Sequence, residues 1–164
     1  MPASVSFSEA NGVGQSVTDS LTNLNFGSND SPNLNTSTYK VAVGEFSFEK
    51  YLKIKVGGTF AELSNMKLFK LSGTYKTDEL IKAIANQTYT QPVNTESAKA
   101  VSAIPTAIES ALAIQSLEDE SLEDETLFTE VGYSKYIVLQ TSSSVSTPTG
   151  VGNEKVIKVQ WDEL

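Results

Sequence analysis

The densest group of side chains that could do chemistry is a tandem acidic repeat, SLEDE at 116–120 followed by SLEDE at 121–125. Calcium takes six to eight oxygen ligands, so these six carboxylates form a metal-site candidate. The EF-hand pattern, however, needs a central glycine that this stretch lacks. We expect mainly a solvated acidic loop or short helix, because like charges repel each other and favour exposure. A docking strip for a basic partner is a second expectation, between this and a calcium site. The candidate ligands are Glu118, Asp119, Glu120, Glu123, Asp124 and Glu125.

The chain has few of the residues that enzymes commonly use for catalysis. Histidine and cysteine are absent, which removes the Ser-His-Asp triad, the cysteine nucleophile and thiolate metal sites. Glycoside hydrolysis needs two carboxyl groups that face each other across a sugar, and proximity in an acidic run does not create that arrangement. The glycines at 12–14 and 57–58 match neither a Walker A loop nor a dinucleotide fingerprint. We predict a protein that is not an enzyme, with no catalytic residues and no cofactor.

Three aromatic residues near the carboxyl terminus suggest a second kind of site. Tyr133, Tyr136 and Trp161 could form a flat platform on which a sugar stacks. Trp161 nevertheless alternates with Ile157 and Val159 along a predicted strand, so the three side chains should point to the same face. Its indole is therefore expected to cap a hydrophobic layer. We favour core packing over sugar binding for these residues.

Charge and hydropathy narrow the choice of partners. The chain has 164 residues and a net charge of −8, which disfavours binding to nucleic-acid phosphates. No apolar run approaches the roughly 20 residues that span a bilayer, and the opening MPASVSFSEANG lacks the features of a signal peptide. We expect a soluble, unexported chain that binds neither nucleic acid nor membranes. Its length predicts a single domain.

Short alternating segments predict strands along most of the chain. Residues 4–9 alternate before an Asn-Gly turn, and residues 46–56 carry the clearest alternation. Further strands are expected at 66–71, 136–139 and 157–161, the last two as a hairpin. The Gly-Gly pair at 57–58 indicates a turn with meander-like pairing after it.

Two segments leave the choice between helix and strand open. Residues 78–85 fit either structure, and residues 107–116 fit a short helix or a strand from 111. The proline-containing stretches around 92 and 105, and the 27–38 stretch, are expected to be loops or edges. The overall prediction is an all-β, single-domain antiparallel β-sandwich over 1–164, jelly-roll or immunoglobulin-like, with room for one short helix. Residues 1–11 are a candidate extended arm, and 116–125 an acidic loop.

Four segments carry a family resemblance: VSFSEANGVGQSVTDSLTNLNFGS, FEKYLKIKVGGTFAELSNMKLFK, TYTQPVNTESAKAVSAIP and GYSKYIVLQTSSSVSTPTGVGNEKVIKVQWDE. Together they resemble small structural proteins of tailed-bacteriophage virions, of the head decoration, auxiliary or neck type. The resemblance spans nearly the whole chain but leaves out the acidic repeat. It rests on the order and character of the segments.

The resemblance implies a structural component of the phage particle. The first expectation is a capsid decoration or auxiliary protein that binds the major capsid protein lattice, as a trimer or another symmetric homo-oligomer. It would lie on the virion surface, and in the host cytoplasm during assembly. The alternatives are a neck or tail component, and a carbohydrate-binding β-sandwich that aids adsorption.

Overall fold

Alternating apolar side chains form six strands of seven to ten residues in the computed structural model, which describes residues 2–117, 126–150 and 152–164. Short strands and one 3-10 helix, η1 (Ile108–Ser110), lie between them. The strands are β1 (Ser4–Asn11), β2 (Ser16–Thr18), β3 (Lys50–Gly57), β4 (Leu63–Ser72), β5 (Leu80–Gln87), β6 (Ser102–Ala103), β7 (Leu112–Ala113), β8 (Gly132–Tyr133), β9 (Tyr136–Ser142) and β10 (Val156–Glu163).

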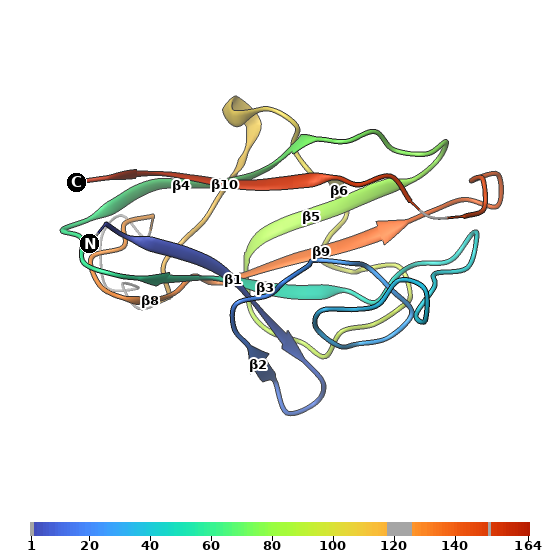
Figure 1. The fold of residues 1–164 in the computed structure, drawn as a ribbon, viewed down its shortest axis with the longest axis horizontal. Coiled ribbons are helices and arrows are strands. Elements are labelled where there is room, and N and C mark those ends of the chain that lie inside the picture. Colours follow the sequence, from blue (N-terminus) through green and yellow to red (C-terminus); the bar gives the residue numbers. More distant parts are fainter. Residues whose placement is uncertain (1, 118–125, 151) are drawn as a thin grey trace.

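Two antiparallel sheets pack together as a single-domain β-sandwich (Figure 1). The larger sheet has the order β2-β1-β3-β9-β5-β6, and β8 also pairs with β3. The smaller sheet has the order β10-β4-β7. The predicted all-β sandwich is therefore confirmed, and the one short helix is η1.

The main core fills the space between the sheets. It takes alternate residues of β3, β4 and β9, because alternate side chains of a strand point to the same face. Trp161 packs against this core together with Ile157 and Val159, as their shared parity predicts. The largest fully buried apolar side chains here are Leu52, Ile54, Leu63, Met66, Leu68, Ile114, Phe128, Ile137 and Leu139.

A second, smaller cluster lies on the outer face of the larger sheet. Tyr51 contacts Tyr89 edge-on with ring centroids 5.0 Å apart, and Tyr136 lies 6.0 Å from Tyr51 and 5.5 Å from Tyr89. Ala100 and Val138 are buried beside them. The connection between β5 and β6 brings Tyr89 and Ala100 over this face, so part of the outer surface of the sheet is covered.

Three sequence-based expectations need correction. Residues 4–11 form β1, which pairs with β2 and β3 of the same chain, so they are part of the sheet and no extended arm. The predicted hairpin of the last two strands is wrong, because β9 pairs with β3 and β5 whereas β10 pairs with β4 in the other sheet. The turn at Gly57 and Gly58 likewise leads from one sheet to the other, so β3 and β4 form no meander.

The ambiguous segments resolve mainly as strands. Residues 80–87 form β5, and the 107–116 stretch forms η1 and then the two-residue strand β7. The strand predicted from residue 46 begins at Lys50, and Phe46 makes only an isolated bridge to Ser142. The part of the chain that the structure describes contains no helix long and apolar enough to cross a membrane.

Candidate functional site

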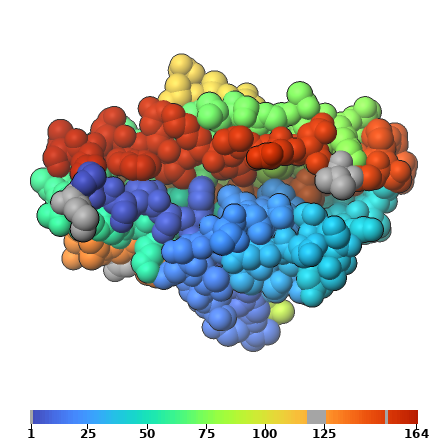
Figure 2. Space-filling view, in the orientation of Figure 1, coloured from blue at the N-terminus to red at the C-terminus, as the bar shows by residue number. Residues whose placement is uncertain are grey.

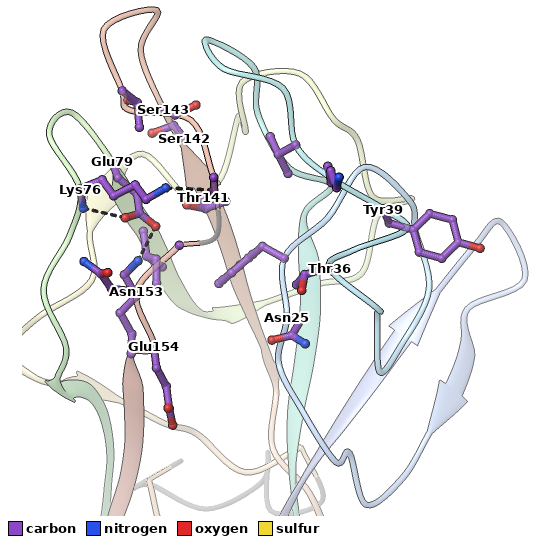
Figure 3. A pocket seen from close by; sticks show the side chains of 18 of the residues that line it. Asn25, Thr36, Tyr39, Lys76, Glu79, Thr141, Ser142, Ser143, Asn153 and Glu154 are labelled. Atoms are coloured by element: carbon purple, nitrogen blue, oxygen red, sulfur yellow. Dashed lines mark hydrogen bonds and ion pairs between the residues drawn. The ribbon is translucent and has the colours of Figure 1, made fainter.

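An open groove of about 1220 Å³ lies between two connections that are far apart in the sequence. One wall is the 22–45 segment, and the other consists of residues from 141–150 and 152–157 with Lys76, Glu79 and Ile81. Figure 2 shows β10, in red, above the blue 22–45 segment that borders it. The close view places Asn25 and Thr36 on the first wall, across from Lys76, Glu79 and Asn153 (Figure 3).

The first wall is held in shape by its own turn-forming residues. Asn35 accepts backbone hydrogen bonds from Thr38 at 3.1 Å and from Tyr39 at 3.0 Å, and its side-chain oxygen accepts one from the amide of Ser37 at 2.9 Å. The amide of Phe48 donates to the carbonyl oxygen of Gly27 at 2.9 Å. Asparagine and glycine favour such turns, so this Asn- and Ser-rich stretch folds as an ordered loop.

The opposite wall is fastened by charged side chains. Glu79 accepts a hydrogen bond from the backbone amide of Lys76 at 2.8 Å, and its other oxygen pairs with the ammonium group of Lys155. The ammonium group of Lys76 donates to the carbonyl oxygens of Pro148 at 3.2 Å and Gly150 at 2.9 Å. These contacts tie the β4–β5 connection to the β9–β10 connection.

Hydroxyl donors hold one more carboxylate near this wall. Asp78 accepts hydrogen bonds from the hydroxyl of Ser146 and, at 3.1 Å, from that of Ser144. The bond from Ser146, and secondly that from Ser144, lowers the pKa of Asp78 below its usual value, because both stabilise the ionised form. The carboxylate thus serves to order the loop.

The groove is lined by many groups that can hydrogen-bond a ligand. Its polar lining combines hydroxyl and amide side chains with the charged side chains of Lys40, Glu45, Lys76, Glu79, Glu154 and Lys155. Two of these charged residues, Glu79 and Lys155, pair with each other. The ring of Tyr39 points away from the opposite wall (Figure 3), so it provides no stacking platform across the groove. The volume exceeds that of a usual small-molecule pocket, which suits an extended segment of a macromolecule.

Strand β10 gives this groove a free backbone edge. It lies at the end of the smaller sheet, and on its side away from β4 no strand of the described ranges 2–117, 126–150 and 152–164 pairs with it. Its first residues, Val156 and Ile157, line the groove, and Val156 is 41% exposed. Near its other end, Glu163 accepts a hydrogen bond from the amide of Ala3 at 3.0 Å. A sheet edge that pairs with no strand of the described residues therefore adjoins the groove.

The structure separates the residues of the predicted aromatic platform. Tyr136 is buried in the tyrosine cluster on the outer face of the larger sheet, whereas Trp161 packs against the main core. The hydroxyl of Tyr133 donates to Asp19 at 3.1 Å, and Lys53 lies over the rings of both Tyr133 and Tyr136. The three rings do not form one surface: Tyr136 and Trp161 pack in the two hydrophobic clusters, as expected, whereas the hydroxyl of Tyr133 bonds Asp19.

Asp19 contacts three side chains near Tyr133: Lys55, Ser8 and Tyr133 itself. Lys55 makes the largest contribution to lowering its pKa, and hydrogen bonds from Ser8 and Tyr133 act in the same direction against some desolvation. The six predicted metal ligands at 118–125 lie outside the described residues. Among the residues that the structure does describe, no group of three or more acidic side chains is arranged to hold a metal ion.

Sequence reasoning missed the groove because its walls come from two turn-rich stretches that only the fold brings together. Their Ser, Thr, Asn and Gly content was visible, but it indicated loops and gave no sign of their proximity. Comparisons with protein-family models, curated proteins and solved structures found no match to this chain.

Proposed function

We propose that this chain is a non-enzymatic structural protein of a tailed-phage particle, a capsid decoration or auxiliary protein that binds the major capsid lattice. The observation that carries the binding role is the free edge of β10 beside the open groove. The phage context comes from the resemblance of the sequence to small virion proteins. A symmetric homo-oligomer fits such a role, because many weak contacts with a repeating lattice then act together.

The lengths of the edge strands single out β10. Within the described part of the chain, the other strands at sheet edges are β2, β6, β7 and β8, with three, two, two and two residues, whereas β10 has eight. Very short edge strands limit pairing with other chains, and a long one provides a template for it. An extended partner segment can add to such an edge through main-chain hydrogen bonds.

The groove supplies side-chain contacts for the same partner segment. Leu24, Phe26 and Val41 contribute apolar surface on one wall, and Val156 and Ile157 contribute it beside the edge strand. In strand addition, the backbone bonds provide affinity and alternate side chains enter such surfaces to provide specificity. A partner protein therefore fits the groove and the edge at the same time.

The location of the chain in particles tests this proposal. Particles of the phage that encodes this chain are purified from an infected culture. Their head and tail fractions are then analysed by quantitative mass spectrometry. We expect the chain in the head fraction, in a fixed ratio to the major capsid protein. Recovery on tails alone would replace decoration by a neck or tail role, and absence from particles would overturn the proposal.

A variant pair tests the role of the edge. Val156→Lys places a charge where the groove meets β10. Binding of the partner would then bury an unpaired charge, so recovery of the variant on particles should fall at least tenfold. Val101→Lys is the matched control, because Val101 is 64% exposed and does not line the groove. Equal recovery of both variants would contradict binding at this edge.

A further inference from the structure

A lysine, a glutamate and an asparagine form a buried set where β1 meets β3. Lys50 is 2% exposed, Glu9 1% and Asn11 9%. The register of the two strands pairs Ala10 with Tyr51, so its next step sets Asn11 opposite Lys50. Glu9 precedes Asn11 by two residues and shares its face. Side chains directly opposite in an antiparallel pair have Cβ atoms about 4.5–5.5 Å apart, within reach of each other.

One carboxylate joins the two nitrogen-bearing side chains. The ammonium Nζ of Lys50 donates to both oxygens of Glu9 at 2.9 Å, and the amide Nδ2 of Asn11 donates to Oε1 of Glu9 at 3.0 Å. The same Nδ2 also donates to Oδ1 of Asp30 at 2.7 Å. Oε1 of Glu9 thus lies between an amine and the nitrogen of a carboxamide.

The carboxamide oxygen of Asn11 is the unusual feature of this set. Oδ1 is buried and has no hydrogen-bond partner in the structure. A buried acceptor without a partner is unfavourable, so such groups in folded proteins call for a specific explanation. A side chain held for reaction at its carbonyl carbon provides one.

We propose that Lys50 and Asn11 form an intramolecular isopeptide bond, with Glu9 as the proton carrier. Glu9 takes a proton from the Lys50 ammonium group, and the neutral amine then attacks Cγ of Asn11. The Nζ–Cγ bond forms and the Cγ–Nδ2 bond breaks. Glu9 returns its proton to the departing nitrogen, which already contacts Oε1. The second proton that Nζ loses on becoming an amide passes by the same carboxylate to the released ammonia, which leaves as an ammonium ion.

The reaction balances without an oxidant or another reactant. One ammonium group and one carboxamide give one secondary amide and one ammonium ion, and Glu9 ends in its original ionisation state. Burial excludes the water that would compete with the amine, and the fixed geometry makes the step unimolecular.

Asp30 acts as a positioning residue in this site. One of its oxygens accepts from Asn11 Nδ2, and the other accepts from the backbone amide of Gly12 at 2.8 Å. The carboxamide is therefore held on its nitrogen side by two carboxylates, one of which, Glu9, also binds the ammonium group of Lys50. The same contact engages the Gly12 amide, the group that would otherwise attack Asn11 to form a succinimide.

Mass spectrometry of the purified full chain tests the bond directly. The intact mass should lie below the sequence mass by one ammonia, about 17 Da. The chain has no arginine and its first lysine is Lys40, so trypsin should release residues 1–40 linked to residues 41–53, with no cleavage after Lys50. An intact mass equal to that of the sequence, with free peptides 1–40 and 41–50, would overturn the proposal.

Variants identify the participating residues. Lys50→Arg keeps the charge but cannot form the amide, and Glu9→Gln removes the proton acceptor while leaving both reacting groups. We expect no linked peptide from Lys50→Arg and at least a tenfold lower yield from Glu9→Gln. Lys55→Arg is the matched control on the same strand, because Lys55 pairs with the partly exposed Asp19, and it should retain the link.

The succinimide at Asn11 gives the same mass loss and must be separated from the isopeptide. It would persist in Lys50→Arg and would leave peptides 1–40 and 41–50 unlinked. That outcome would contradict the proposal. Circular dichroism of each variant distinguishes a missing reaction from a missing fold, and the linked peptide of the unaltered chain is decisive even where a variant does not fold.

Discussion

The side-chain oxygen of Gln140 accepts a 2.9 Å hydrogen bond from the backbone amide of Ser97, 43 residues away in the chain. The amide nitrogen of Gln140 donates to the carbonyl oxygens of Ser47 at 2.9 Å and Thr95 at 2.7 Å. Gln140 is fully buried. A polar residue in β9 thereby holds the β5–β6 connection against the outer face of the larger sheet.

Gln140→Leu should lower the free energy of unfolding by about 3 kcal/mol, because three hydrogen bonds to backbone groups are lost at about 1 kcal/mol each. Urea denaturation followed by tryptophan fluorescence measures the change. Gln91→Leu, at an exposed position of the same connection, should stay within about 0.5 kcal/mol of the unaltered protein. Similar losses in both variants would contradict the role of Gln140.

Gly73→Ala should destabilise the protein by about 2 kcal/mol or more, since a left-handed backbone disfavours a Cβ atom. Gly73 has φ +93°, and a Cβ there would lie 2.2 Å from the carbonyl oxygen of Glu154. Gly14→Ala is the control, because a Cβ at Gly14 would have no atom within 4 Å. Thermal unfolding of the two variants should differ clearly, and equal midpoints would refute the close approach.

Glu79→Gln should lower the free energy of unfolding by about 1–3 kcal/mol, because Lys155 loses its ion-pair partner in a mostly buried position. Glu96→Gln breaks the contact of Lys82 with a carboxylate side chain that is 66% exposed. Exposed pairs contribute little, so this control should change the stability by less than about 1 kcal/mol. Urea denaturation compares them, and the reverse order would contradict the groove wall described above.

Stability should fall as the pH rises from about 10 to 12. Burial is the main cause that raises the pKa of Tyr89 to about 12 from an ordinary value of 10.0. Below pH 10 both states keep the proton and the stabilisation is complete, whereas above it the unfolded chain loses its proton first. Urea denaturation at several pH values measures the slope.

Tyr89→Phe provides the control for the alkaline transition. This variant loses the hydrogen bond from the hydroxyl to the carbonyl oxygen of Gly12, so it should be less stable at neutral pH. Its stability should nevertheless decrease less steeply above pH 10, because one shifted group is gone. An unchanged slope would show that Tyr89 does not titrate in this range.

The alternation of apolar and polar residues predicted where strands lie better than it predicted which strands pair. Alternation identified β1, most of β3, β4, β9 and β10, and the parity of Trp161 predicted its place against the core. The same pattern could not decide which sheet receives each strand, because alternation reports one buried face and not the strand alongside. The hairpin of β9 and β10 was therefore mispredicted across a connection that changes sheets.

The candidate site was beyond sequence reasoning for a similar reason. The groove brings Asn25 and Thr36 to face Glu79 and Asn153, which lie far from them in the sequence. The buried set of Glu9, Asn11 and Lys50 has the same origin. In the sequence, Glu9 belonged to the alternating residues 4–9 and Asn11 to an Asn-Gly turn, and only the register of β1 and β3 sets them beside Lys50.

The central position of β9 has a consequence for how the chain folds. It separates β3 from β5 in the larger sheet, although both precede it by about 50 residues or more. During synthesis, neither of these strands can reach this partner until residues 136–142 have left the ribosome. Non-local pairing of this kind slows folding and leaves apolar strands uncovered in the meantime. Refolding should therefore be slow and sensitive to protein concentration.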